Sequence, residues 1–406
     1  MLTPAINSPK AYPPVTARPE KEWTVLYVFN GDNDLKENTS HQFMDVVKNG
    51  APDDSYVATF CARGDLEWAP GNIGRKLQHT VSNLFRKKKP VEVPSNWEGN
   101  RVFVVDPKGG WTDPVAAPEG EIHQGATISD FLKWGIESFP SRHVAVVFST
   151  HGDAHNGVLM NGQGKEMPLP ELRGTLEDAA ALHGRELDLV AFESCNMAEA
   201  EVAYELHDVA RALVASPTVL YGVPWNHAEA LKQIADSKDG LTAAVGLVDK
   251  AKECFGEGTP SISAIDLDQM PKLKDALDRF GHNLLRSDIN ESSLERMIYA
   301  ARSYGRAAQG YSKPQRELID LFGFCREVLK NGQSREGPAA ESAREVCELL
   351  PQVVPNFMDR QESYGEGHGL SIFPPTMRGL FKPLGDKYPK LKMSLEGDWD
   401  DFLAKR

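Results

Sequence analysis

HVAVVFSTHG at residues 143–152 and LDLVAFESC at residues 187–195 decide how this chain folds. In both runs, apolar and β-branched residues follow one another with little polar alternation, which is typical of a strand buried on both faces of a parallel sheet. Ligands and catalytic groups gather at the carboxyl ends of such strands. One run ends in the imidazole of His151 and the other in the thiol of Cys195. The sequence therefore predicts a site where these two side chains meet in space.

Further strands and helices alternate through the first two thirds of the chain. Apolar runs predict strands at 23–29, 55–61, 101–105, 212–216 and 261–267, the last of them closing the main sheet. Apolar residues at helical spacing predict helices at 128–139, 172–183 and 198–209. This alternation predicts an α/β fold with a mostly parallel central sheet covered by helices on both faces.

Composition divides the chain into three parts. Residues 1–22 hold five prolines and no continuous apolar run, so we expect a disordered N-terminal tail. Residues 23–270 carry the strand–helix alternation and form the predicted catalytic domain. Residues 271–406 are mainly helical in pattern and predict a helical C-terminal extension packed on the core. Within it, the short apolar piece at 369–375 could return to a sheet edge, where proline is tolerated.

Charge and cysteine content narrow the classes of protein. A net charge of −13 disfavours a nucleic-acid binder, and no apolar run approaches the roughly 18 residues of a membrane span. The five cysteines are scattered and form no C-x-x-C pair, which suits a reducing compartment. The N-terminus has no typical secretory signal, so the compartment stays open between the cytoplasm and non-classical export. The basic run at 86–89 is interpreted as a solvated loop.

The thiol and the imidazole together predict a Cys–His hydrolase. The helix expected directly after Cys195 would lower the pKa of the thiol through its dipole. Ser194 is a poor nucleophile candidate because no G-x-S-x-G elbow surrounds it. A metal hydrolase is the rival chemistry, since His151, Asp153 and His155 are three potential zinc ligands. No further ligand group is placed to complete a tetrahedral site, which disfavours it.

With these residues in hand, the chain resembles the clostripain family of cysteine peptidases, in the caspase-like clan. The resemblance is carried by the strand that ends in THG at 150–152 and by ESCNMAEAEVAYEL at 193–206. Shorter matches lie at 23–35, 215–225, 263–267, 318–324 and 369–374. The resemblance implies an α/β/α caspase-like sandwich with a helical C-terminal extension, and cleavage of peptides after a basic residue.

The resemblance also implies roles for individual residues. Cys195 corresponds to the nucleophile, His151 to the paired imidazole, and the backbone N–H groups of Gly152 and Cys195 to the oxyanion hole. Glu193 takes the position two before the nucleophile, where relatives usually have an aspartate at the base of the primary specificity pocket. It keeps the negative charge and adds a methylene. The alternative for Glu193 is a structural carboxylate bonded to backbone amides.

Three more residues correspond to the walls of that pocket. Ser216 and Trp225 would line it, although Trp225 fits the hydrophobic core equally well. Thr218 stands where relatives often carry another acidic group, which suggests a less acidic pocket and puts the choice between Lys and Arg in doubt.

Some members of the family are activated by cleavage between the two catalytic residues. Here the stretch 156–169 is interpreted as an exposed loop, and Lys165 within it is the first candidate for self-cleavage. Some relatives depend on calcium, but the chain has no D-x-D-x-D-G loop, and we expect no cofactor. The loop at 30–34 could supply oxygen ligands; capping the following helix through its Asn and Asp side chains is the favoured role.

The sequence therefore predicts a cysteine endopeptidase whose partners are peptides or proteins with basic residues. The alternative is a non-catalytic relative that keeps the pocket and binds basic peptides. The presence of both His151 and Cys195 weighs against that alternative.

Overall fold

The computed structural model of the chain describes residues 11–64, 97–110, 114–220, 224–254, 261–301, 318–331, 336–359, 367–374 and 385–405. The basic run at 86–89, for which a solvated loop is predicted, lies outside these ranges. So do residues 1–10 of the predicted tail.

A single sheet of eight strands from the described residues forms the centre of the molecule, in the order β3-β2-β1-β4-β5-β6-β7-β9. The strands are β1 (Lys21–Gly31), β2 (Ser55–Arg63), β3 (Gly99–Val104), β4 (Ser141–Ser149), β5 (Leu187–Glu193), β6 (Ala210–Ala215), β7 (Ile262–Asp266) and β9 (Asn356–Met358). The five central strands β2, β1, β4, β5 and β6 are parallel, whereas β3, β7 and β9 pair antiparallel toward the two edges. The predicted α/β fold with a mostly parallel sheet is confirmed. The strand expected to close the sheet, β7, is not the last, because β9 pairs beyond it.

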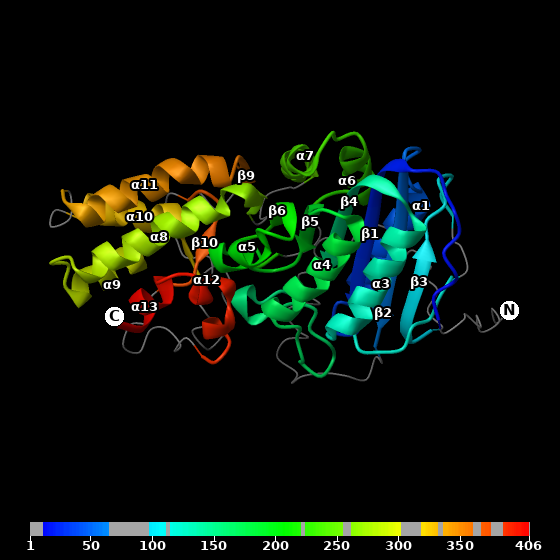
Figure 1. Ribbon diagram of the computed structural model, residues 1–406, viewed down its shortest axis with the longest axis horizontal. Helices are drawn as coiled ribbons and strands as arrows, with labels where there is room; N and C mark the ends of the chain where they lie inside the picture. Colours follow the sequence, from blue (N-terminus) through cyan, green and yellow to red (C-terminus); the bar gives the residue numbers. More distant parts are fainter. Residues whose placement is uncertain are drawn as a thin grey trace.

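Helices cover both faces of this sheet (Figure 1). One face carries α1 (Lys36–Asn49), α6 (His227–Ala235) and α7 (Gly240–Cys254); the other carries α3 (Gly125–Ser138), α4 (Leu169–His183) and α5 (Ala200–Leu206). Each helix turns a stripe of apolar side chains toward the strands, as the spacing of those residues predicts. The sheet is therefore the middle layer of three.

Strand β1 lies at the heart of the core because it pairs with β2 on one side and β4 on the other. Its side chains alternate between the two faces: Val25 and Tyr27 join the cluster under α1, α6 and α7, and Leu26 and Val28 join the opposite cluster. All four are fully buried. A buried side chain of this size stabilises the fold by about 1.5–3 kcal/mol, so the strand anchors both layers.

The C-terminal part packs against one end of this assembly (Figure 1). It contains α8 (Met270–Leu285), α9 (Glu291–Ala300), α10 (Leu321–Lys330), α11 (Pro338–Val353), α12 (Lys392–Leu395) and α13 (Trp399–Lys405). The helical pattern predicted there is present in the described residues. The apolar piece at 369–375 gives β10 (Ser371–Ile372), which pairs with β8 (Ile319–Asp320) in a separate two-stranded sheet and not with the main one. The hydrophobic cluster is continuous from the sheet into these helices, and the predicted division at 270 stays a prediction.

Residues 11–20 contain no helix or strand, and Tyr12 and Pro13 lie against α3. Tyr12 stacks on Trp134 with ring centroids 5.3 Å apart, and the Trp134 indole donates to the carbonyl of Pro13 over 3.2 Å. The guanidinium of Arg18 lies 4.8 Å from the centre of the Phe139 ring. These contacts fix the described part of the N-terminal segment to the body of the protein.

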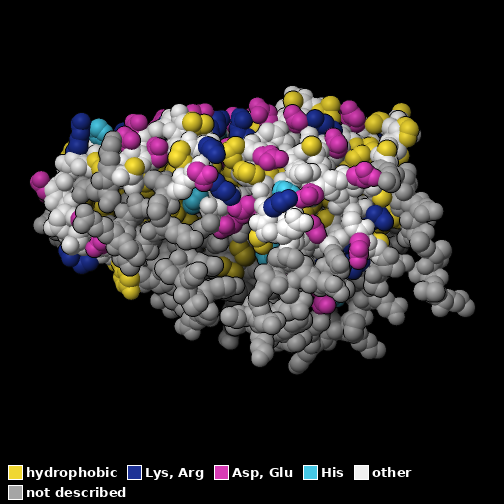
Figure 2. Space-filling view, turned by 90° about the horizontal axis from the view of Figure 1, so that it is seen from below, with side chains coloured by type: hydrophobic (Ala, Val, Ile, Leu, Met, Phe, Trp, Pro, Cys, Tyr) yellow, Lys and Arg dark blue, Asp and Glu magenta, His cyan; other side chains and the backbone are white. Residues whose placement is uncertain are grey.

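The surface mixes charges of both signs. Figure 2 shows acidic and basic side chains interspersed over the described part of one face, without a large patch of either kind. Within the described ranges, no helix combines the length and the apolar composition needed to cross a membrane.

Candidate active site

The two reactive side chains follow neighbouring parallel strands. In the pairing of β4 with β5, Ser149 lies opposite Glu193, so the chain leaves both strands at the same level. His151 and Cys195 each lie two residues further on, and adjacent strands are about 4.8 Å apart. A methyl group placed on Gly152 would lie 2.5 Å from the carbonyl oxygen of Cys195, so the two loops are in direct contact and only glycine fits between them.

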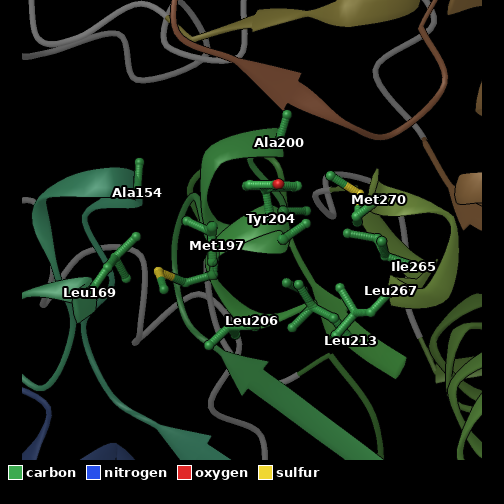
Figure 3. Close-up of a cluster of buried hydrophobic side chains, with 14 of the residues drawn as sticks. Ala154, Leu169, Met197, Ala200, Tyr204, Leu206, Leu213, Ile265, Leu267 and Met270 are labelled. Atoms are coloured by element: carbon green, nitrogen blue, oxygen red, sulfur yellow. The ribbon is translucent and has the colours of Figure 1, made fainter. Parts of the chain in front are cut away.

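The nucleophile candidate lies on a fixed turn. Asn196 adopts a left-handed backbone with φ of 60°, which asparagine tolerates better than most residues. Its N–H donates to the carbonyl of Thr218 over 3.0 Å, and the N–H of Ala198 donates to the carbonyl of Ser216 over 2.9 Å. Met197, the next residue, is buried in the cluster drawn in Figure 3. The turn is therefore pinned from both sides.

The thiol of Cys195 is half-buried, and burial raises its pKa. The backbone N–H of Leu220 donates to Sγ over 3.3 Å and partly offsets that rise, whereas the charge of Asp153 adds to it. The predicted help from a helix dipole is wrong, because α5 begins only at Ala200, five residues later. The protonated thiol is therefore the favoured state at neutral pH.

His151 is held by a carboxylate that the sequence analysis did not assign to the site. Its Nε2 lies 2.7 Å from Oδ1 of Asp34, with both side chains partly exposed. This leaves Nδ1 as the nitrogen that can exchange a proton with a thiol. The predicted capping role is wrong for Asp34: α1 has Leu35 as its N-cap and no side-chain capping bond. The topology held the missing signal, because the loop that carries Asp34 leaves β1, which pairs with β4.

Glu193 lies at the end of β5 with its side chain completely buried. Its Oε1 is 2.9 Å from Nε2 of His227 on α6, and its Oε2 accepts from the amide of Gln42 on α1 over 3.3 Å. Ser149 donates in turn to Gln42 over 2.5 Å. The carboxylate thus contacts side chains, through an ion pair with His227 and a hydrogen bond from Gln42, and not backbone amides as the structural alternative expects. Sequence reasoning missed His227, which follows no strand and matches no motif.

The other pocket candidates are also buried. Ser216 donates through Oγ to the carbonyl of Thr218 over 3.0 Å, and together they form the segment that pins the turn after Cys195. Trp225 belongs to the cluster under α6 and α7, and its indole N–H has no hydrogen-bond partner among the described residues.

Lys165 lies in an exposed loop, as predicted, and backbone hydrogen bonds order this loop as a hairpin. Val158 and Met167 exchange backbone hydrogen bonds of 2.9 and 2.8 Å, and Asn161 donates to the carbonyl of Lys165 over 2.8 Å. Lys387 of the C-terminal part pairs with Glu166 over 2.5 Å. The side chain of Lys165 itself remains exposed.

The two histidines of the rival zinc interpretation face different carboxylates. His151 contacts Asp34, whereas Nδ1 of buried His155 lies 2.8 Å from Oε1 of Glu199. The part of the chain that the structure describes contains no group of three or more His, Cys, Asp or Glu side chains arranged to hold a metal ion.

The backbone N–H groups of Gly152 and Cys195 belong to the two loops that contact each other. No backbone carbonyl of the described residues accepts from the N–H of Gly152 or of Cys195. Donors left open in this way, next to a thiol, suit the negative oxygen of a tetrahedral acyl intermediate.

Comparisons with known proteins identify the family and the fold of the chain. The model of the clostripain family, peptidase C11, matches residues 90–405. Among solved structures, an inactive zymogen C11 protease from Parabacteroides distasonis superposes with a TM-score of 0.65 at 16% identity, covering 94% of this chain and 99% of that one. A secreted C11 cysteine protease from Bacteroides thetaiotaomicron gives 0.63 at 16% identity, covering 93% and 99%. The same kind of protein in complex with an irreversible peptide inhibitor gives 0.64 at 17% identity, covering 94% and 99%.

None of the curated proteins matches the chain. At these identities the solved structures establish the fold alone, and that fold is the caspase-like sandwich. The family model covers most of the chain, so the chain belongs to the clostripain family and is a cysteine-type endopeptidase.

Proposed function

We propose that the protein cleaves peptide bonds after Arg or Lys, with Cys195 as nucleophile and His151 as its proton-transfer partner. One observation carries the proposal: Gly152 packs directly on the carbonyl of Cys195, at the ends of two adjacent parallel strands. The residues next to this contact, His151 and Cys195 itself, are the proposed imidazole and thiol.

In the proposed reaction, the proton of Cys195 passes to His151 and the sulfur attacks the carbonyl carbon of the scissile bond. The tetrahedral intermediate collapses to an acyl-thioester while the imidazolium protonates the leaving amine. Water then attacks the thioester, gives its proton to His151 and releases the carboxylic acid, and the thiol is restored. None of these reaction steps needs a metal ion, and we expect chelators to leave the rate of peptide cleavage unchanged.

The raised pKa of Cys195 bears on the first step. A protonated thiol needs a base within reach, and Asp34 supports His151 in that role, because a carboxylate on Nε2 stabilises the imidazolium. The N–H groups of Gly152 and Cys195 are the proposed oxyanion donors. Loss of one such donor costs about 3–4 kcal/mol of transition-state stabilisation in other hydrolases.

The proposed preference for basic residues rests on Glu193. A buried carboxylate near the nucleophile favours a cationic substrate side chain, because a charge in a dry site requires a partner. The net charge of −13 also favours encounter with cationic peptides.

Self-cleavage after Lys165 is part of the proposal. The carbonyl of this residue accepts a hydrogen bond inside the hairpin, and peptidases bind their substrates extended. The hairpin between Val158 and Met167 therefore has to open before the chain can be cut there. Lys165→Ala should keep the chain intact on incubation, with Lys387→Ala accelerating the cut by releasing Glu166.

The test is turnover of a peptide library that varies the residue before the scissile bond. We expect cleavage after Arg and Lys by the wild type and none by Cys195→Ala or His151→Ala. Binding of basic peptides without turnover would support the non-catalytic alternative instead. Cleavage after acidic or apolar residues would overturn the proposed specificity and leave the dyad standing.

A further inference from the structure

The carboxylate of Glu193 already has an internal counter-charge. Asn226 caps α6 by accepting from the N–H groups of Ala228 and Glu229 over 2.9 and 3.3 Å, which fixes His227 as the first residue of the helix. From there the imidazole reaches Glu193 over 2.9 Å, with side-chain exposures of 1% and 0%. A basic substrate side chain that is to meet Glu193 therefore meets a site that is occupied.

The surroundings of the pair are mostly apolar. The ring of His227 packs near Tyr27 and Phe29 of β1, with centroids 6.1 and 6.5 Å away. In so dry a place an unpaired carboxylate is costly, so the compensating charge has to come from the protein or from the substrate.

We propose that His227 is a specificity-determining residue of this peptidase, which neutralises Glu193 from inside the protein and competes with the cationic side chain of the substrate. The proposal rests on the proposed function, in which Glu193 is the floor of the primary specificity pocket. When His227 is protonated, its positive charge balances the carboxylate of Glu193, and the pocket is close to neutral. Deprotonated, it leaves a net negative charge that only the substrate can balance.

The charge state of His227 depends on three titratable groups that face it: Glu193 from β5, Tyr27 from β1 and Asp45 from α1. Burial alone would lower the pKa of His227, but the charge and the hydrogen bond of Glu193 outweigh it, and Asp45 adds to them, so the pKa is raised. Gln42 on α1 contributes an amide without charge. His227 therefore stays protonated, and paired with Glu193, to a higher pH than an ordinary histidine would.

Two peptides that differ only in the residue before the scissile bond, arginine or its neutral isostere citrulline, isolate this effect. Arginine stays charged across the whole range, so only the protein titrates. We expect the ratio of kcat/KM for arginine over citrulline to rise with pH as His227 loses its proton, by about tenfold per pH unit at most. This measurement needs no substitution, so it does not depend on the folding of a variant.

His227→Gln removes the titration. The ratio in this variant should be flat between pH 5.5 and 9.5 and should match or exceed the highest wild-type ratio. His155→Gln is the matched control, because it alters a buried imidazole paired with a glutamate on the other face of the sheet. It should leave the pH dependence of the ratio as in the wild type.

The outcomes separate the two claims. A wild-type preference for arginine that does not change with pH, and that His227→Gln leaves unaltered, overturns the role of His227 alone. Equal cleavage of both peptides at every pH, in wild type and variant, overturns the proposed basic specificity itself. A pH-dependent ratio that survives in His227→Gln assigns the titration to another group and also contradicts the inference.

Discussion

Two buried carboxylate–imidazole pairs lie on opposite faces of the same sheet, both close to the ends of β4 and β5. Glu193 and His227 are 2.9 Å apart under α1 and α6, and Glu199 and His155 are 2.8 Å apart on the face of α5. All four side chains are almost completely withdrawn from solvent. The other contacts of the two carboxylates differ. From this difference we infer that one pair positions the loops of the site and the other sets the charge of the pocket.

Glu199 is bonded to the backbone of the site. Its second oxygen accepts from the backbone N–H of His155 over 2.6 Å, so one side chain holds a loop in place. His155 comes four residues after His151, and Glu199 comes four residues after Cys195. The pair therefore ties together the two loops that carry the proposed dyad. We infer that the Glu199–His155 pair keeps these two loops in position.

Glu193 is bonded only to side chains in the contacts described above, those of His227 and Gln42. Its neighbours belong to helices and not to the loops of the dyad. Loss of this carboxylate should therefore change the charge of the pocket more than the placement of the thiol. We infer that the Glu193–His227 pair sets the charge of the proposed specificity pocket.

Breaking the two pairs should produce the largest effects. Glu199→Ala removes the partner of a buried imidazole and of a backbone N–H, and we expect a loss of about 3–5 kcal/mol in the free energy of unfolding. Turnover should fall for every peptide alike, because the dyad loses its support.

Glu193→Ala should reduce cleavage after arginine far more than after citrulline. Urea unfolding and kcat/KM on the two peptides measure both, and an equal change in selectivity for the two variants would refute the distinction.

Asp34 and His151 form a third pair of the same chemistry, which sharpens the comparison because it is partly exposed. Asp34→Asn should cost less than about 1 kcal/mol of stability, since solvent screens such pairs. It should lower kcat by about 10- to 100-fold, as part of what general acid–base catalysis contributes, with little change in KM. A fall in stability without a fall in kcat would show that Asp34 is structural and does not orient His151.

The ion pair between Glu193 and His227 should make the free energy of unfolding depend on pH. Because the pKa of His227 is raised on folding, its contribution to stability is complete below about pH 6.5, its unfolded value, and is lost as the pH rises through the folded value. The difference in unfolding free energy between wild type and His227→Gln should therefore shrink from pH 6 to pH 9.5. A difference that is constant over this range would contradict a charged pair.

The opposite face predicts a second effect of pH on stability, through Glu201. This buried carboxylate accepts from the hydroxyl of Tyr388 over 2.7 Å and from the N–H of Phe373 over 3.1 Å, and so links α5 to the C-terminal part. Burial and the charge of Glu199 raise its pKa to about 8. The folded state therefore holds a proton that the unfolded state releases above about pH 4.5, and stability should fall between about pH 5 and 8. Glu201→Gln should flatten that slope in thermal unfolding curves.

The contrast between the two faces also explains what could be predicted from the sequence. His151, Cys195 and Gly152 follow apolar runs whose position in a parallel sheet dictates where their ends meet, so pattern alone brings them together. Asp34 was within reach of the same reasoning, because β1 is also a buried parallel strand. Two expectations failed for local reasons: α5 starts after a turn, and at the start of α1 the side chain of Asn33, and not that of Asp34, accepts from the N–H of the N-cap Leu35.

The partners of the buried carboxylates lay beyond such reasoning. His227 is set by the start of α6, and His155 by a short 3₁₀ turn at Ala154–Asn156. Neither position follows from the periodicity of apolar residues, because each depends on how a helix or a turn packs on a distant strand. The hydrogen bonds that order the loop around Lys165 were not predicted, because they link buried Val158 and Met167, which lie in a stretch without a strand-length apolar run.

The central claim is that Cys195 and His151 act together on a peptide carbonyl. It is tested most directly by the rate at which a peptide ending in an arginyl chloromethyl ketone alkylates the protein, followed by mass spectrometry. The account predicts a single adduct on Cys195, none in Cys195→Ala, and a rate in His151→Ala that is lower by at least tenfold, as expected when a general base is lost. An adduct on another residue, or an equal rate in His151→Ala, would contradict it.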